Sequence, residues 1–130
     1  MKAFRVAVDF DGTIVLHKYP EVGEDVPGAV EWLKKWQEAG AELYLWTMRD
    51  SNYLADAVEW FKKNDIILAG VNDASDTWTT SRKLYAHVYV DDAGVCVPLI
   101  FPRDGSRGYI DFSRVGPKVL EQIRIYQLTN

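Results

Sequence analysis

Two patterns of apolar residues alternate along the chain. Short apolar runs, typical of strands buried on both faces of a sheet, occupy residues 4–8, 43–46, 66–68 and 86–90. Apolar residues at helical spacing predict three amphipathic helices, at residues 27–40, from Asp50 or Ser51 onward, and at residues 117–127. Strands that alternate with helices predict a parallel sheet with helices on both faces.

Three polar segments interrupt this alternation. Residues 14–26 have no helical period and are expected to form a small flap, and residues 70–80 predict a loop. Residues 95–110 would hold an edge strand near 97–101 between prolines. We expect one domain, residues 1–130, with a three-layer, Rossmann-like α/β fold and a mainly parallel central sheet of about five strands.

Charge and composition narrow the function classes. The chain has 15 Lys and Arg against 19 Asp and Glu, a net charge of -4, and no basic block, so the usual signal of nucleic-acid binding is absent. No apolar run approaches the roughly 20 residues that cross a bilayer. The lone Cys96 cannot form an intramolecular disulfide, and residues 1–5 enter a strand directly, which favours a cytoplasmic protein.

Polar side chains that carry chemistry follow three predicted strands. Asp9 and Asp11, one residue apart and followed by Gly12, come after the first strand, Thr47 after the second and Asp91 after the fourth. Because the carboxyl ends of parallel strands share one edge of a sheet, these side chains are expected to line one ligand site. By themselves, the first two acids would fit a solvated turn equally well.

The order of these residues resembles the haloacid dehalogenase-like superfamily of phosphohydrolases. Its signature, D-x-D-x-[TV], then Thr or Ser, a later Lys and an acidic pair, is matched by residues 9–13, Thr47, Lys83 and residues 91–92. The resemblance covers residues 4–92 and implies hydrolysis of a phosphate monoester. Asp9 would attack phosphorus to form an aspartyl-phosphate, and Asp11 would act as general acid and base.

The resemblance also implies a cofactor and a binding set. An anionic nucleophile is repelled by phosphate, so a hard cation is needed, and Mg²⁺ would be held by Asp9, the backbone carbonyl of Asp11, and Asp91. Asp92 would be a further or water-mediated ligand. Phosphate would be bound by Thr47, Arg49, Lys83 and main-chain donors near Phe10, Asp11 and Met48.

The assignments of Lys83 and Asp92 leave alternatives open. Three other basic residues, Lys62, Lys63 and Arg82, are within reach of the same role in the sequence. Asp92 would serve almost equally well as a cap for the following loop.

Other side chains near the expected site also have structural interpretations. Arg49 would reach a substrate anion, although a salt bridge with Asp50 or Asp56 is the favoured interpretation. His17 and Tyr19 lie on the flap, where they would reach a leaving group, although solvated flap residues are the favoured interpretation. His87 is predicted to be a hydrogen-bonded core histidine. Trp78 is predicted to line the mouth of the pocket or to pack under a loop. Core packing is predicted for Trp32, Trp36, Trp46 and Trp60.

Neither position at which the superfamily inserts a cap domain has room for one here. Residues 14–26 are too few, and residues 48–82 are taken up by one helix, one strand and a loop. A capless, open site would suit a phosphorylated small molecule or a bulky phosphate ester, or would be completed in a homodimer.

Two other function classes fit parts of the pattern. A phospho-receiver domain also combines acids, Thr and Lys, but its phosphorylated Asp lies on a middle strand, and no Asp follows the run at residues 66–68 in that manner. A catalytically silent binding module would keep the fold, although here the acids, Thr and Lys are all present.

Overall fold

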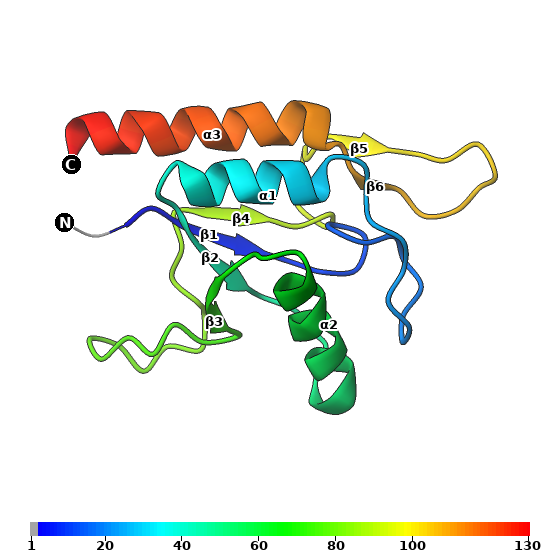
Figure 1. Ribbon diagram of the computed structural model, residues 1–130, viewed down its shortest axis with the longest axis horizontal. Coiled ribbons are helices and arrows are strands. Elements are labelled where there is room, and N and C mark those ends of the chain that lie inside the picture. The colour runs from blue at the N-terminus through cyan, green and yellow to red at the C-terminus, as the bar shows by residue number, and fades with distance from the viewer. Residues whose placement is uncertain (1–2) are drawn as a thin grey trace.

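The computed structural model describes residues 3–130, so Met1 and Lys2, at the start of the run predicted to enter the first strand, lie outside the described residues. The elements are, in order, β1 (Arg5–Val8), α1 (Ala29–Glu38), β2 (Glu42–Leu45), α2 (Ser51–Lys63), β3 (Leu68–Val71), β4 (Val88–Val90), β5 (Leu99–Ile100), β6 (Tyr109–Ile110) and α3 (Phe112–Thr129). The chain has a broadly Rossmann-like α/β fold (Figure 1).

The central sheet has four parallel strands in the order β3-β2-β1-β4. The expectation of about five strands is wrong, because the segment near 97–101 forms only the two-residue β5. This strand pairs antiparallel with β6, outside the central sheet. Pro98 and Pro102 flank β5 and have no N–H to donate, which limits its length.

The third strand also begins later than predicted, at Leu68 and not at Ile66. Asp65 has a left-handed φ of 57° and ends the turn after α2. Ile67 is 75% exposed, and its N–H donates to the Gln37 side chain at 2.7 Å. Residues 66–67 therefore belong to the connection and not to the sheet.

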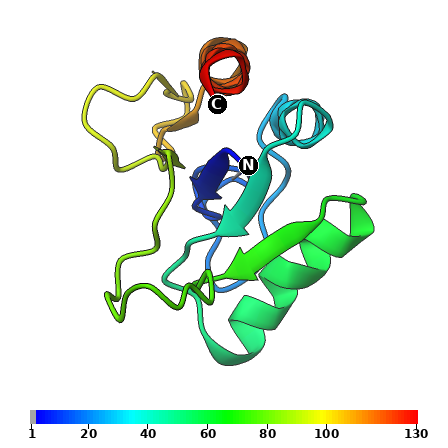
Figure 2. The same ribbon diagram turned by 90° about the vertical axis from the view of Figure 1, so that its left-hand side faces the viewer.

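The two faces of the sheet are covered differently. Val6 and Val8 of β1 pack in the main core with residues of all three helices, whereas Ala7 packs with Tyr44 and Leu84 on the opposite face. That second face is covered by the coil of residues 72–87, which lies opposite α1 and α3 in Figure 2. The expectation of helices on both faces is wrong. Right-handed connections place α1 and α2 on one face, and the returning connection from β3 to β4 has no helical period.

The last helix starts five residues earlier than predicted, at Phe112. Asp111 caps it by accepting a hydrogen bond from the Ser113 N–H at 3.0 Å. Pro117 lies inside the helix near its beginning. Trp36 of α1 donates its indole N–H to the Gly116 carbonyl at 3.0 Å, so α1 and α3 are joined by a buried hydrogen bond as well as by apolar packing.

The flap of residues 14–26 folds back against the motif that follows β1. Val15 forms β-bridges with both Asp11 and Asp25. As expected, no cap domain is inserted within residues 3–130. None of the described helices is both long enough and apolar enough to cross a membrane.

Candidate active site

Three predicted site residues emerge at one edge of the sheet. Asp9 follows β1, Thr47 comes shortly after β2, and Asp91 follows β4. The strand order reverses between β1 and β4, and ligands of open α/β sheets bind at such a switch point, outside the carboxyl ends of the strands. A cavity of about 600 Å³ opens there and is lined by all three residues. Its volume is typical of a small-molecule site.

Three carboxylates gather in this cavity. Asp9, Asp91 and Asp92 each contribute one oxygen, and these oxygens lie within 4.8 Å of one another. Burial, as the largest cause, and the negative charges of the other two residues together raise the pKa of Asp9 to about 8, against the lowering effect of a hydrogen bond with the Phe10 backbone. Three carboxylates at this distance repel one another unless a cation is present.

The donor set fits a hard divalent cation. Carboxylate oxygens are the ligands that Mg²⁺ prefers, and the charge of the ion would offset the repulsion among them. The backbone carbonyl of Asp11, another expected ligand, accepts no hydrogen bond from residues 3–130, so its lone pairs are available. Asp9, Asp91, Asp92 and this carbonyl are therefore the groups that would hold the ion.

Gly12 and Thr13 hold the acidic motif against β4 and the flap. The buried Thr13 hydroxyl lies 3.4 Å from Asp9 Oδ2, to which it donates, and accepts from the Asp92 N–H at 3.1 Å. Gly12 has a φ of 79°, and a Cβ at this position would lie 1.9 Å from His17 Nε2. Only glycine fits this close approach.

Asp11 is held by Arg49, which is 2% exposed. Nε donates to Oδ2 at 2.8 Å and Nη2 donates to Oδ1 at 2.7 Å, so both carboxylate oxygens accept a charge-assisted hydrogen bond. These bonds raise the pKa of Arg49. Arg49 was expected to form a salt bridge with Asp50 or Asp56, and this choice of partner is wrong. The loops after β1 and β2 place Asp11 against Arg49 instead.

The remaining donors of Arg49 are also used within the protein. Nη1 donates to the carbonyls of Pro20 at 3.0 Å and Tyr53 at 3.2 Å, and Nη2 donates to the carbonyl of Glu21 at 2.8 Å. With its two bonds to Asp11, the guanidinium has five hydrogen bonds and joins the flap, α2 and the acidic motif. It is a structural cation, and no donor is left for a substrate anion.

The residues predicted to bind phosphate are placed unequally. Thr47 lines the cavity, its N–H donates to Asn72 Oδ1 at 2.8 Å, and its hydroxyl oxygen accepts from the Arg49 N–H at 3.2 Å. Met48 is 98% exposed at the same cavity. The side chain of Phe10 is buried in the core, so only its backbone is available to a ligand.

Lys83 is not brought to this cavity. It lies on the coil that covers the second face of the sheet, with Nζ 5.3 Å from the ring centroid of Tyr89. The alternatives Lys62, Lys63 and Arg82 do not line the cavity either. The phosphate-binding lysine that the resemblance implied is therefore not brought to this cavity by the fold.

His17 and Arg107 also line the cavity, and of these two only His17 was considered from the sequence. His17 Nε2 lies 3.0 Å from Asp92 Oδ2 and is largely buried, so the expectation of a solvated His17 is wrong. The Asp91 side chain accepts a hydrogen bond from the Ala93 N–H at 2.8 Å. The loop after β4 is therefore capped by Asp91 and not by Asp92, for which this role was considered. Arg107, on the loop between β5 and β6, also lines the cavity, although its surroundings in the sequence are typical of a solvated turn.

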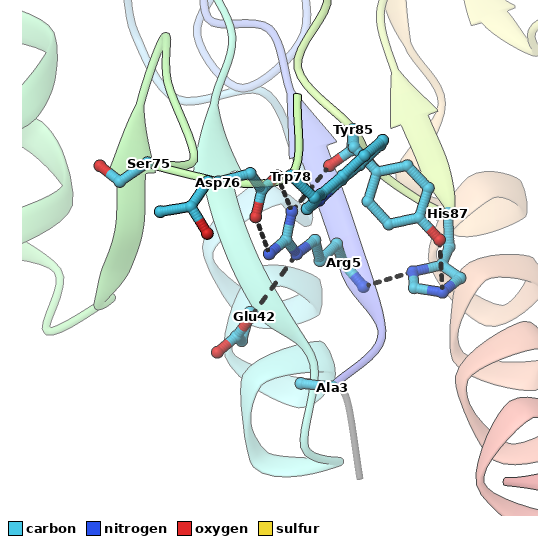
Figure 3. A pocket seen from close by; sticks show the side chains of 9 residues that line it. Ala3, Arg5, Glu42, Ser75, Asp76, Trp78, Tyr85 and His87 are labelled. Atoms are coloured by element: carbon cyan, nitrogen blue, oxygen red, sulfur yellow. Dashed lines mark hydrogen bonds and ion pairs between the residues drawn. The ribbon is translucent and has the colours of Figure 1, made fainter. Parts of the chain in front are cut away.

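A second cavity, of about 720 Å³, lies at the opposite end of the sheet (Figure 3). Arg5 lies in it and binds Asp76 through Nη1 at 2.8 Å. His87 Nδ1 accepts from the Arg5 N–H at 3.0 Å, so the expected hydrogen bond is present, but the expected core position is wrong, because His87 is only partly buried and lines this cavity. Trp78 lines this cavity and not the acidic one.

As predicted, the core contains or packs against Trp32, Trp36, Trp46 and Trp60.

Comparison with known proteins gives one informative match. No protein-family model matches the sequence, and no curated protein matches it. A solved structure of a conserved protein from Bacteroides thetaiotaomicron is 34% identical in sequence, covers 93% of both chains and superposes with a TM-score of 0.76. The chain belongs to the same family as this conserved Bacteroides protein.

Proposed function

We propose that this chain is a magnesium-dependent phosphohydrolase of the capless, haloacid dehalogenase-like type, which cleaves phosphate monoesters through an aspartyl-phosphate on Asp9. The observation that carries the proposal is the group of three carboxylates, Asp9, Asp91 and Asp92, within 4.8 Å at the carboxyl ends of two strands. Thr47 adds a hydroxyl to the same cavity. An acidic group beside a hydroxyl at a switch point suits the binding of a metal ion and a phosphate.

In the first step, a carboxylate oxygen of Asp9 attacks phosphorus, and the bond from phosphorus to the leaving oxygen breaks. Asp11 gives a proton to that oxygen. Thr47 donates its hydroxyl hydrogen to a phosphoryl oxygen. The chemistry that a bound Mg²⁺ supplies is the neutralisation of the negative charges of Asp9 and phosphate.

In the second step, water attacks the phosphorus of the aspartyl-phosphate, Asp11 takes the proton, and Asp9 is restored. Arg49 fixes the orientation of the Asp11 carboxylate through both of its oxygens. Because Asp11 carries a proton before the first step and after the second, both roles require that one of its oxygens binds the proton at its second lone pair or is released from Arg49.

The surroundings of the cavity support a substrate class and a setting. It is not covered by a cap, which suits a phosphorylated small molecule, a bulky phosphate ester or a site completed in a homodimer. Cys96 is a free, exposed thiol, which suits the reducing cytoplasm.

A silent binding module is the second candidate function. It is favoured by the position of Lys83 outside the cavity and by the two bonds that engage Asp11. Such a module would bind a metal ion or an anion at the same carboxylates without turnover.

A hydrolysis assay tests the proposal. The protein with Mg²⁺ should release phosphate from an aryl phosphate, and Asp9→Asn should abolish release while its circular dichroism spectrum stays native. The matched control is Asp65→Asn, an exposed position after α2, which should keep full activity. Activity in the Asp9 variant would refute the nucleophile, and a wild-type protein that binds Mg²⁺ without turnover would support the silent module.

A further inference from the structure

Arg107 is the cation of the acidic cavity whose charge is not engaged by a carboxylate. It lines the cavity from the loop between β5 and β6. Among residues 3–130, no carboxylate lies within ion-pair distance of its guanidinium. Of the other basic side chains of this cavity, Arg49 binds Asp11 and His17 lies against Asp92.

A free guanidinium beside an acidic metal site is suited to bind an anion. Its planar fork matches two oxygens of a phosphoryl group, and each hydrogen bond to phosphate is charge-assisted. In the proposed reaction, a phosphate dianion must enter a cavity that contains Asp9, Asp11, Asp91 and Asp92. Coulomb repulsion opposes this entry unless a second positive charge stands beside the metal ion. Lys83, the side chain expected to supply that charge, does not line the cavity.

The loop that carries Arg107 is anchored to the site at its end. β5 pairs with β6 through Leu99–Ile110 and Ile100–Tyr109, and the N–H of Ile110 donates to the carbonyl of Gly12 at 3.1 Å. Arg107 is three residues from this anchor. The hairpin is therefore fastened to the acidic motif, which keeps Arg107 at the cavity although its loop is exposed.

Resting on the proposed function, we propose that Arg107 binds the phosphoryl group of the substrate and that the substrates carry a single phosphate group. One unengaged cation in addition to the metal ion can bind one phosphate. A second phosphate on the same molecule would meet the carboxylates or the exposed, uncharged Met48 and Tyr19 at the same cavity.

The experiment compares Arg107→Ala with Arg103→Ala, a matched arginine on the same loop that does not line the cavity. With an aryl phosphate and saturating Mg²⁺, Arg107→Ala should raise KM by about ten- to a hundredfold, the effect of losing one or two charge-assisted hydrogen bonds. Arg107→Lys should restore part of the loss, and Arg103→Ala should match the wild type. Equal KM values in the two alanine variants would overturn the inference.

A binding measurement separates this inference from the proposed function. Inorganic phosphate is titrated calorimetrically into Asp9→Asn with Mg²⁺, with and without Arg107→Ala, because this requires no turnover. Affinity should fall with the added Arg107 variant, and unchanged affinity would refute Arg107 as the anion site even if the wild type is an active phosphatase. Tight binding without hydrolysis by the wild type would instead refute the phosphatase and keep Arg107. An aryl monophosphate should have a higher kcat/KM than the bisphosphate of the same ring, and the reverse order would overturn the substrate class.

Discussion

Arg49 holds both carboxylate oxygens of Asp11, at 2.7 and 2.8 Å, across 38 residues of sequence. The guanidinium carbon also lies 5.0 Å from the ring centroid of Phe10 and 5.1 Å from that of Tyr19. The orientation of the proposed acid and base is therefore set by the loop that follows a different strand. A buried guanidinium is stable here because a carboxylate and three carbonyls accept from it.

Replacing Arg49 by Met should destabilise the fold by about 3–5 kcal/mol, because Asp11 and three carbonyls lose their donor. Urea unfolding measures this loss. Arg114→Met, at an exposed position of α3, is the control and should change stability by less than about 0.5 kcal/mol. Adding Asp11→Asn to Arg49→Met should recover part of the loss, and two fully additive effects would show that the pair is not coupled.

The stability of the metal-free protein should depend on pH through Asp9. Its pKa is raised from an ordinary value of 3.8 to about 8, so between these values the folded state holds a proton that the unfolded state releases. The contribution of this group to stability is therefore fully present below about pH 4, falls as pH rises and is lost above about pH 8. Asp9→Asn should remove this fall and be more stable than the wild type at pH 8, by on the order of a few kcal/mol. Urea titrations in a chelator at several pH values test this, and parallel pH profiles would contradict it.

Magnesium should stabilise the wild type, because a bound cation would offset the mutual repulsion of the Asp9, Asp91 and Asp92 carboxylates. At a free concentration one hundred times the Kd, the gain would be about 2.7 kcal/mol. Thermal unfolding with increasing Mg²⁺ should show the shift, and Asp91→Asn should lose most of it while Asp65→Asn keeps it. A shift that survives Asp91→Asn would place the ion elsewhere.

Asp11→Asn should affect poor leaving groups most, because an alkoxide needs a proton that a nitrophenolate does not need. Loss of a general acid costs about 10²–10⁴ in rate. We expect kcat/KM for an alkyl phosphate to fall by that factor and kcat/KM for a nitrophenyl phosphate to fall much less. Equal losses on both substrates would assign Asp11 a structural or metal-binding role instead.

Gly12→Ala should destabilise the protein more than Gly105→Ala. Both glycines have a positive φ, of 79° and 84°, so both variants have backbone strain of about 1–2 kcal/mol. Only the Gly12 variant also places a Cβ 1.9 Å from His17 Nε2, whereas a Cβ at Gly105 has no atom within 4 Å. The difference in unfolding free energy between the two variants measures the cost of displacing His17 from Asp92. Equal losses in the two variants would show that the flap moves without a measurable cost.

The sequence was sufficient to predict the residues that strand ends bring together. Asp9, Thr47 and Asp91 follow buried apolar runs, and parallel pairing places the ends of such runs at one edge. The early start of α3 was also open to prediction, because Asp111 and Ser113 form a capping signal that precedes the apolar helical positions.

Contacts between loops could not be predicted in this way. Asp50 and Asp56 were the partners expected for Arg49, and its pairing with Asp11 instead depends on how the loops after two strands meet. Arg107 lies in a turn whose composition favours solvent. The coil of residues 72–87 has no periodicity that would fix the direction of Lys83, so the resemblance to a motif could not show which face that side chain would reach.

The position of β1 between β2 and β4 has a consequence for motion. Asp9 follows a strand that pairs on both sides, whereas Asp91 follows the three-residue edge strand β4, which pairs only with β1 within the described sheet. Local opening of such an edge requires less free energy than opening of the centre. An ion shared by Asp9 and Asp91 would fasten the more readily opened strand to the more protected one, and slower hydrogen exchange of the β4 amides would reveal occupancy of the site without any turnover.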